Sequence, residues 1–218
     1  MGSTLEIHRI RARQMLNATK ADAEAERAFA DLWRKELGEH SRTVAATAHS
    51  VEASFCAAMA TLESSVRRGG KILLFGNGGS ASDAQHIAAE LVVRYKSNRL
   101  PIAALALTTD TATLTACAND LGYDTIFQRQ IEALGRGGDV AFAISTSGRS
   151  QNVLLGLRQA RTMGMRTVGL SGGIGGEMRE LCDALLVVPS STTSRIQEMH
   201  ITIGHMLCKA LEERLGLV

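Results

Sequence analysis

The sequence predicts an α/β fold: a flavodoxin-like, five-stranded parallel sheet with helices on both faces, preceded by N-terminal helices. Two observations support this prediction. After residue 70, short continuous apolar runs alternate with amphipathic stretches, as expected of a parallel sheet buried on both faces. Before residue 69 the chain contains no proline and only two glycines, Gly2 and Gly38, and its apolar residues recur at helical spacing. We therefore divide the chain into a helical segment, 1–68, and a sheet domain, 69–218.

The helical segment is expected to form two long helices. Gly38 predicts the end of the first helix, and Gly69 with Gly70 predicts the end of the second. Apolar residues such as Phe55, Met59 and Leu62 repeat every three or four positions in the second helix. Helices of this length need a partner surface, so we expect them to pack on the sheet domain and in oligomer contacts.

The sheet domain should contain five strands separated by helices. The predicted strands are Ile72–Phe75, Ile102–Leu107, Val140–Ser145, Thr167–Leu170 and Ala184–Val188. The predicted helices cover about 81–95, 110–118, 124–134, 151–163, 176–182 and 193–214. In such sheets the crossovers are right-handed and ligands bind beyond the carboxyl ends of the strands.

Composition narrows the function classes. Aromatic residues make up only 4% of the 218 residues, and the net charge of +2 comes from interspersed basic and acidic residues, which disfavours nucleic-acid binding. No apolar run is long enough for a membrane span, and no signal peptide is recognisable. The four cysteines form no C-x-x-C pair, so we expect reduced thiols in a cytoplasmic protein: Cys56, Cys117, Cys182 and Cys208.

The first glycine-rich loop, Gly76–Ser82, follows a predicted strand and precedes a predicted helix. Its glycines allow a ligand to approach the backbone, and the helix start offers free N–H groups to an anion. The spacing of Gly76, Gly78 and Ala81 also matches a dinucleotide fingerprint, but the first acid after the next strand, Asp110, comes too late to bind a ribose. A simple tight turn with a serine cap is the remaining alternative.

The second loop, Ser145–Ser150, offers four hydroxyl groups around one glycine at the start of a helix. Capping a helix needs one hydroxyl, whereas several hydroxyls with backbone N–H groups suit a phosphate monoester. The third loop, Ser171–Gly176, is interpreted as a flexible turn. The chain contains no Gly-Lys-Ser/Thr sequence, which argues against a nucleoside triphosphate site.

Two helical stretches carry candidate metal ligands. His86 and Glu90 are four residues apart and share a helix face, and the last helix contains Gln197 and His205. These groups could hold one Zn²⁺-type ion or transfer protons. Spacing alone leaves the question open, because Gln197 and His205 lie about 12 Å apart along a helix. Gln197 could also form a capping box with Ser194, and a lone histidine such as His200 is usually just hydrogen-bonded.

From about Gly70 to Leu215 the chain resembles a sugar isomerase (SIS) domain, and more narrowly the phosphoheptose isomerases. Four segments carry the resemblance: Asn77–His86, Cys117–Asp120, Ser145–Ser150 and Arg195–His200. The N-terminal helices also fit that family in length, although about the first 20 residues look like an extension whose role is open.

The resemblance implies a role for individual residues. The residues matching zinc ligands, one ion per subunit, are His86, Glu90, Gln197 and His205. The residues matching substrate contacts are Asn77, Gly78, Gly79, Ser80, Glu90, Asn119, Asp120, Ser145, Thr146, Ser147, Ser150 and Gln197. Glu90 and His205 match the catalytic base and acid, in either order. Some members carry an aspartate at the position of Ser194. This chain therefore lacks a nearby carboxylate that those members have.

The resemblance also implies an activity and an assembly. The family converts sedoheptulose 7-phosphate to D-glycero-D-manno-heptose 7-phosphate, the first step towards nucleotide-activated heptose, and is usually a homotetramer with active sites where subunits meet. Similar non-catalytic SIS modules bind the replication initiator protein, but they lack the counterparts of Glu90 and His205. A sugar-phosphate sensor, or an isomerase for another sugar phosphate, is a third possibility.

Overall fold

The computed structural model describes the backbone of residues 2–218 and the side chains of Asp22 and residues 24–218. It separates into two compact units, 1–42 and 43–218. The first unit is part of a single helix, α1 (Gly2–Ser50), and the second contains the sheet. Any role of the side chains of residues 1–20 lies outside the described part of the chain. Residues 43–68 belong to the same unit as the sheet.

The prediction that a helix ends at Gly38 is wrong, because Gly38 lies inside α1. A glycine within a helix costs roughly 1 kcal/mol relative to alanine, which good helix formers on either side can offset. The neighbours Leu37 and Glu39 are such residues. Gly38 does not adopt the left-handed conformation that ends helices.

The break between the first two helices occurs instead at Val51, with α2 spanning Glu52–Arg67. Three hydroxyl groups bond back to carbonyl oxygens around this point: Thr47 to Thr43, Ser50 to Ala46 and Ser54 to Val51. Such back-bonding bends helices. The predicted end of the second helix is confirmed, since Gly69 has φ of +78° and its N–H donates to the Val66 carbonyl.

The sheet has five parallel strands in the order β2-β1-β3-β4-β5, which confirms the predicted flavodoxin-like topology. The strands are β1 (Ile72–Gly76), β2 (Ala104–Ala106), β3 (Val140–Ser145), β4 (Arg166–Gly172) and β5 (Ala184–Val188). The other helices are α3 (Gly79–Val92), α4 (Thr111–Asp120), η1 (Tyr123–Thr125), α5 (Ile126–Leu134), α6 (Gln151–Thr162), α7 (Met178–Leu181) and α8 (Thr193–Arg214). The edge strand β2 is shorter than predicted.

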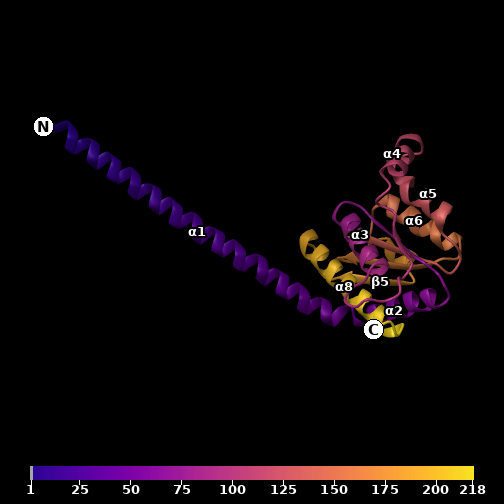
Figure 1. The fold of residues 1–218 in the computed structure, drawn as a ribbon. Coiled ribbons are helices and arrows are strands. Elements are labelled where there is room, and N and C mark those ends of the chain that lie inside the picture. Colours follow the sequence, from indigo (N-terminus) through magenta and orange to yellow (C-terminus); the bar gives the residue numbers. More distant parts are fainter. Residues whose placement is uncertain (1) are drawn as a thin grey trace. The chain divides into compact units, whose positions relative to one another are not determined.

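Helices lie on both sides of the sheet (Figure 1), and alternate residues of the central strands face two separate apolar layers. Ile72 and Leu74 of β1 pack with α2, α3 and α8 on one face of the sheet. Leu73 and Phe75 pack with α5 and α6 on the other face. Both faces of β1 and β3 are buried, which explains their continuous apolar sequences. Because all strands are parallel, the loops after β1, β3 and β4 emerge at one edge of the sheet.

Candidate functional site

Two helices bring three of the predicted metal ligands together. α3 carries His86 and Glu90 one turn apart, and α8 carries His205. His86 Nε2 lies 2.8 Å from His205 Nε2 and 3.4 Å from Glu90 Oε1. One ligand atom from each residue lies within 4.8 Å of the other two. His86 is exposed and the other two are half-buried, so solvent reaches the cluster.

The geometry of this cluster suits a zinc-type ion. Imidazole nitrogens and carboxylate oxygens bind Zn²⁺ at about 2.0–2.2 Å, so two nitrogens of a tetrahedral complex are about 3.3 Å apart. The two histidine nitrogens would have to separate by only about half an ångström to reach that spacing. The two ring nitrogens are within hydrogen-bond distance of each other. Neutral imidazole is the form of histidine that binds metals.

The fourth predicted ligand, Gln197, contacts the start of α3. A Cβ atom on Gly79 would collide with the Gln197 side-chain amide in its present position. His86 lies seven residues further along α3, about 10 Å along the helix axis. The structure thus joins Gln197 to Gly79, a predicted substrate contact. Its role as a metal ligand stays a prediction.

Asp83, one turn before His86 on α3, is a candidate proton-transfer residue that was not predicted from the sequence. Its Oδ2 atom is buried and has no hydrogen-bond partner among the described residues. Burial raises the pKa of this carboxyl to about 6, although the charge of His86 acts in the opposite direction. A carboxyl group with such a pKa can carry a proton close to neutral pH.

His200 lies outside the cluster, in agreement with its interpretation as a hydrogen-bonded core histidine. Its side chain is fully buried, and Nε2 lies 3.1 Å from the Ser171 carbonyl oxygen. Burial lowers the pKa of His200 to about 4, and the hydrogen bond to Ser171 offsets only part of this effect. His200 is therefore neutral in the folded protein at physiological pH.

The serine-rich loop after β3 places its hydroxyl groups around the start of α6. Ser150 occupies the N-cap position, yet its side chain accepts no hydrogen bond from the first turn of the helix. Its Oγ atom lies instead 3.2 Å from Ser145 Oγ. Ser147 is exposed and accepts a hydrogen bond from the Arg149 N–H. This loop can offer hydroxyl groups and a helix N-terminus to an anion.

The glycine loop after β4 supports the serine loop, a role that its sequence did not indicate. The Met178 N–H donates to the Gly148 carbonyl, and the Gly172 N–H donates to the Thr146 carbonyl. A Cβ atom on Gly148 would collide with the Gly175 backbone. Gly148 also has φ of +63°, where other residues are strained. The two loops therefore depend on each other for their shape.

The first glycine loop is bonded to the first turn of α6 by a pair of side-chain amides. Asn77 Nδ2 donates to Asn152 Oδ1 over 2.8 Å, and Asn152 Nδ2 donates back to Asn77 Oδ1 over 2.9 Å. Tyr123 donates its hydroxyl proton to the same Asn77 oxygen. The sequence analysis missed Asn152 and Tyr123. A signal existed for Asn152, since it is a polar residue on the buried face of α6, where it is only 2% exposed.

Three of the predicted substrate contacts remain to be placed: Ser80, Asn119 and Asp120. Ser80 is buried beneath the first loop, close to Gly76, so its side chain serves packing in this conformation. Asn119 and Asp120 lie exposed at the end of α4, where Asn119 donates a hydrogen bond to Asp120. A small cavity of about 130 Å³ lies between the first loop and Tyr123, and its lining includes Asn77 and Gly78.

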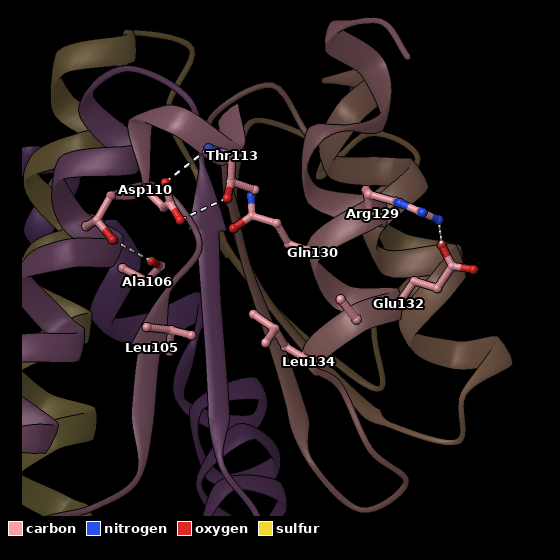
Figure 2. A pocket seen from close by; sticks show the side chains of 10 residues that line it. Leu105, Ala106, Asp110, Thr113, Arg129, Gln130, Glu132 and Leu134 are labelled. Atoms are coloured by element: carbon pink, nitrogen blue, oxygen red, sulfur yellow. Dashed lines mark hydrogen bonds and ion pairs between the residues drawn. The ribbon is translucent and has the colours of Figure 1, made fainter. Parts of the chain in front are cut away.

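A larger cavity of about 520 Å³ lies beside the edge strand β2, between α4 and α5 (Figure 2). Its polar groups are engaged with one another or with the backbone. Asp110 accepts hydrogen bonds from Thr113 at the start of α4, Arg129 pairs with Glu132, and Gln130 donates to two backbone carbonyls. The predicted site residues do not line it. The carboxyl edge of the sheet thus remains the candidate site.

A scan against family models matches residues 37–172 to the SIS domain. Curated relatives include the phosphoheptose isomerase of Paramagnetospirillum magneticum, 58% identical over 184 residues, covering 84% of this chain and 96% of the relative. The phosphoheptose isomerase of Burkholderia pseudomallei is 47% identical over 203 residues, covering 93% of this chain and 96% of the relative.

Solved structures give the same relationship. The phosphoheptose isomerase of Neisseria gonorrhoeae superposes with a TM-score of 0.81 at 38% identity, covering 85% of this chain and 99% of that chain. The enzyme of Francisella tularensis gives a TM-score of 0.81 at 34% identity, covering 84% and 97%. In the described part of this chain, none of the helices has the length and apolar character of a membrane span.

Proposed function

The chain belongs to the phosphoheptose isomerases, enzymes of the SIS domain family, and on this basis we propose that it converts sedoheptulose 7-phosphate to D-glycero-D-manno-heptose 7-phosphate. The observation that carries the proposal is the convergence of His86, Glu90 and His205 between α3 and α8, in a chain that also has a hydroxyl-rich loop after β3. A non-catalytic module has no need for this cluster. The product would supply the synthesis of nucleotide-activated heptose for surface glycans such as lipopolysaccharide.

The proposed mechanism is a proton transfer between neighbouring carbons of the open-chain sugar. The phosphate group is anchored by the serine loop and the start of α6. Glu90 removes a proton from C1 of the ketose, and His205 returns a proton at C2 or moves protons between the two oxygens. A Zn²⁺ ion held by His86, Glu90 and His205, with Gln197 as the fourth ligand, would act as a Lewis acid towards the substrate oxygens. A carboxylate that binds a metal ion is a weaker base. Glu90 would therefore have to release the ion, or share it loosely, in order to take the proton.

The test is NMR spectroscopy of sedoheptulose 7-phosphate incubated with the purified protein as isolated, after chelation, and after return of Zn²⁺. We expect the aldose 7-phosphate to form, to stop forming in chelator and to form again when zinc is restored. Turnover that chelation leaves unchanged would remove the metal from the proposal. Absence of turnover in every condition would favour a partner-binding module, to be followed by a binding assay with the replication initiator protein.

The serine loop gives a second prediction. Ser147→Ala removes one exposed hydroxyl from the proposed phosphate anchor, so KM should rise by about five- to tenfold while kcat stays within about twofold, the magnitude of one typical lost hydrogen bond. Steady-state kinetics on the heptulose phosphate measures both constants. Ser64→Ala, on α2, is the matched control. An unchanged KM would show that Ser147 does not bind the phosphate.

We also propose a homotetramer with active sites at subunit interfaces. The described part of the first unit exposes four large apolar side chains, which a single helix cannot bury by itself: Phe29, Leu32, Trp33 and Leu37. In the second unit an apolar groove of about 300 Å³ lies between residues 44–55 and α8, next to the turn that carries His205. Light scattering should give four times the 23.3 kDa chain mass, and a monomer at working concentration would contradict the assembly.

The cytoplasm is the compartment we propose, since the four cysteines are free in this structure. Burial raises the pKa of both Cys182 and Cys208 to about 12, which keeps these thiols protonated and unreactive. Mass spectrometry of the protein from cells, with thiols blocked at lysis, should detect four alkylated cysteines. A disulfide in that material would argue for an oxidising compartment.

A further inference from the structure

A buried ion pair lies behind the cluster of His86, Glu90 and His205. Arg99, in the connection between α3 and β2, has a fully buried side chain, and that of Glu212 on α8 is 3% exposed. Arg99 Nε donates to Glu212 Oε1 over 2.7 Å. Buried pairs of this kind rarely add stability over apolar residues of similar volume, because removing two charges from water is costly. Their presence therefore needs another explanation.

The other nitrogens of Arg99 bind the end of α3. Nη2 donates to the Glu90 carbonyl over 2.7 Å, and Nη1 donates to the Leu91 carbonyl over 2.8 Å. The carbonyls of the last helical turn have no partner within the helix, and a cation there also complements the helix dipole. Arg99 thus fixes the backbone of the residue whose side chain is the proposed base. The planar guanidinium can reach the carboxylate and both carbonyls at once.

Glu212 holds a second element of the site in place. Its Oε1 atom also accepts a hydrogen bond from the Tyr95 N–H over 2.9 Å. The Tyr95 ring packs against the His205 ring, with centroids 5.5 Å apart. Burial alone would raise the pKa of Glu212, but the hydrogen bonds from Tyr95 and Arg99 lower it below its usual value. Glu212 is therefore an anion, as the pairing with Arg99 requires.

We propose that Arg99 and Glu212 are positioning residues. Together they fix the position of Glu90 on α3 relative to His205 on α8. Neither side chain hydrogen-bonds to the side chains of His86, Glu90 or His205. Arg99 acts through the backbone of Glu90, and Glu212 acts through Tyr95 on the His205 ring. This inference rests on the proposed function, since it assigns the pair to the metal and acid/base cluster.

The deciding variant replaces both charges with apolar residues, Arg99→Met with Glu212→Leu. Such a replacement usually keeps a protein folded, since no unpaired charge is left buried. We expect a folded protein that binds Co²⁺ and Zn²⁺ about tenfold or more weakly, with an altered Co²⁺ visible spectrum, as is typical when supporting groups around a metal ligand are lost. In steady-state kinetics kcat should fall by about tenfold while KM changes little, because the phosphate anchor lies on another loop.

The matched control removes a charge pair that bonds to neither α3 nor α8. Lys71 pairs with the buried Asp139 next to the first residues of β1 and β3. Lys71→Met with Asp139→Asn should lower stability but leave metal affinity, the Co²⁺ spectrum and kcat as in wild type. If the Arg99/Glu212 double variant behaved in the same way, the pair would be merely structural and the proposal would be overturned.

A second variant decides the matter if the double variant does not fold. Arg99→Lys keeps the ion pair with Glu212, but a single ammonium group cannot serve the carboxylate and both α3 carbonyls in the same geometry. We expect metal affinity to fall by about threefold or more, and wild-type affinity would overturn the proposal. Wild-type protein that bound no Co²⁺ would overturn the proposed metal site and this inference with it. Wild-type binding that the variants retain would overturn this inference alone.

Discussion

Replacing Glu90 with glutamine should lower kcat for the heptulose phosphate by at least about a hundredfold, the usual contribution of an acid/base group. The amide has nearly the shape of the carboxylate, but it cannot accept the proton from C1. Glu90 is half-buried at the surface of α3, so the fold should remain intact. Rapid-mixing or coupled assays at saturating substrate would measure kcat directly.

The experiment must separate lost proton transfer from lost metal. Metal content and Zn²⁺ affinity of the Glu90→Gln variant should therefore be measured beside its kinetics, with kcat taken at saturating Zn²⁺. Glu132→Gln is a suitable control, since Glu132 is an exposed residue of α5 that pairs with Arg129 beside the edge-strand cavity. If Glu90→Gln retained wild-type turnover at full zinc occupancy, Glu90 would not be the base, and the role would pass to His205 or to Asp83.

Acidification should destabilise the wild-type protein through His200, and a variant without this imidazole should lack that contribution. The folded-state pKa of about 4 lies below the ordinary value of 6.5. Between these values the unfolded chain binds a proton that the folded chain does not, so the free energy of unfolding falls as the pH decreases from 6.5 to 4. The full loss for a shift of this size is about 3 kcal/mol.

Urea unfolding at pH 7 and at pH 4.5, followed by circular dichroism, would test this expectation. His200→Gln is expected to be less stable at pH 7, because it alters a packed site, but the additional loss at pH 4.5 should be smaller than in wild type by about 2–3 kcal/mol. His49→Gln, an exposed position of α1, serves as the control. If the free energy of unfolding fell equally with pH in wild type and in His200→Gln, His200 would not cause the loss of stability in acid.

The sheet domain was largely predictable from the sequence, because burial on both faces imposes continuous apolar strands such as Ile72–Phe75. The end of the first helix was not predictable from glycine alone. Gly38 is tolerated inside α1, whereas the break at Val51 depends on hydroxyl groups that bond back to the helix backbone. Such bonds form only once the local geometry exists, so residue type gave no clear signal.

The site was predictable in its members but less so in its connections. His86, Glu90 and His205 converge as the family resemblance implied, whereas helical spacing alone had left their convergence open. The reciprocal amide bonds between Asn77 and Asn152 join the first glycine loop to the first turn of α6, 75 residues apart in sequence. The same holds for Arg99 and Glu212, whose pairing depends on how α3 packs on α8. Contacts of this kind are determined by tertiary packing, which no local pattern in one sequence records.

The distribution of aromatic residues gives this protein two separate optical reporters. Trp33 is the sole tryptophan of the chain, and it lies 67% exposed on α1 in the first unit. The only two tyrosines, Tyr95 and Tyr123, both lie in the second unit, one against His205 and the other bonded to Asn77. Tryptophan emission will therefore report on the surroundings of α1, and tyrosine absorbance will report on the surroundings of His205 and Asn77. The two signals can thus follow the proposed assembly and the proposed site separately, without any label.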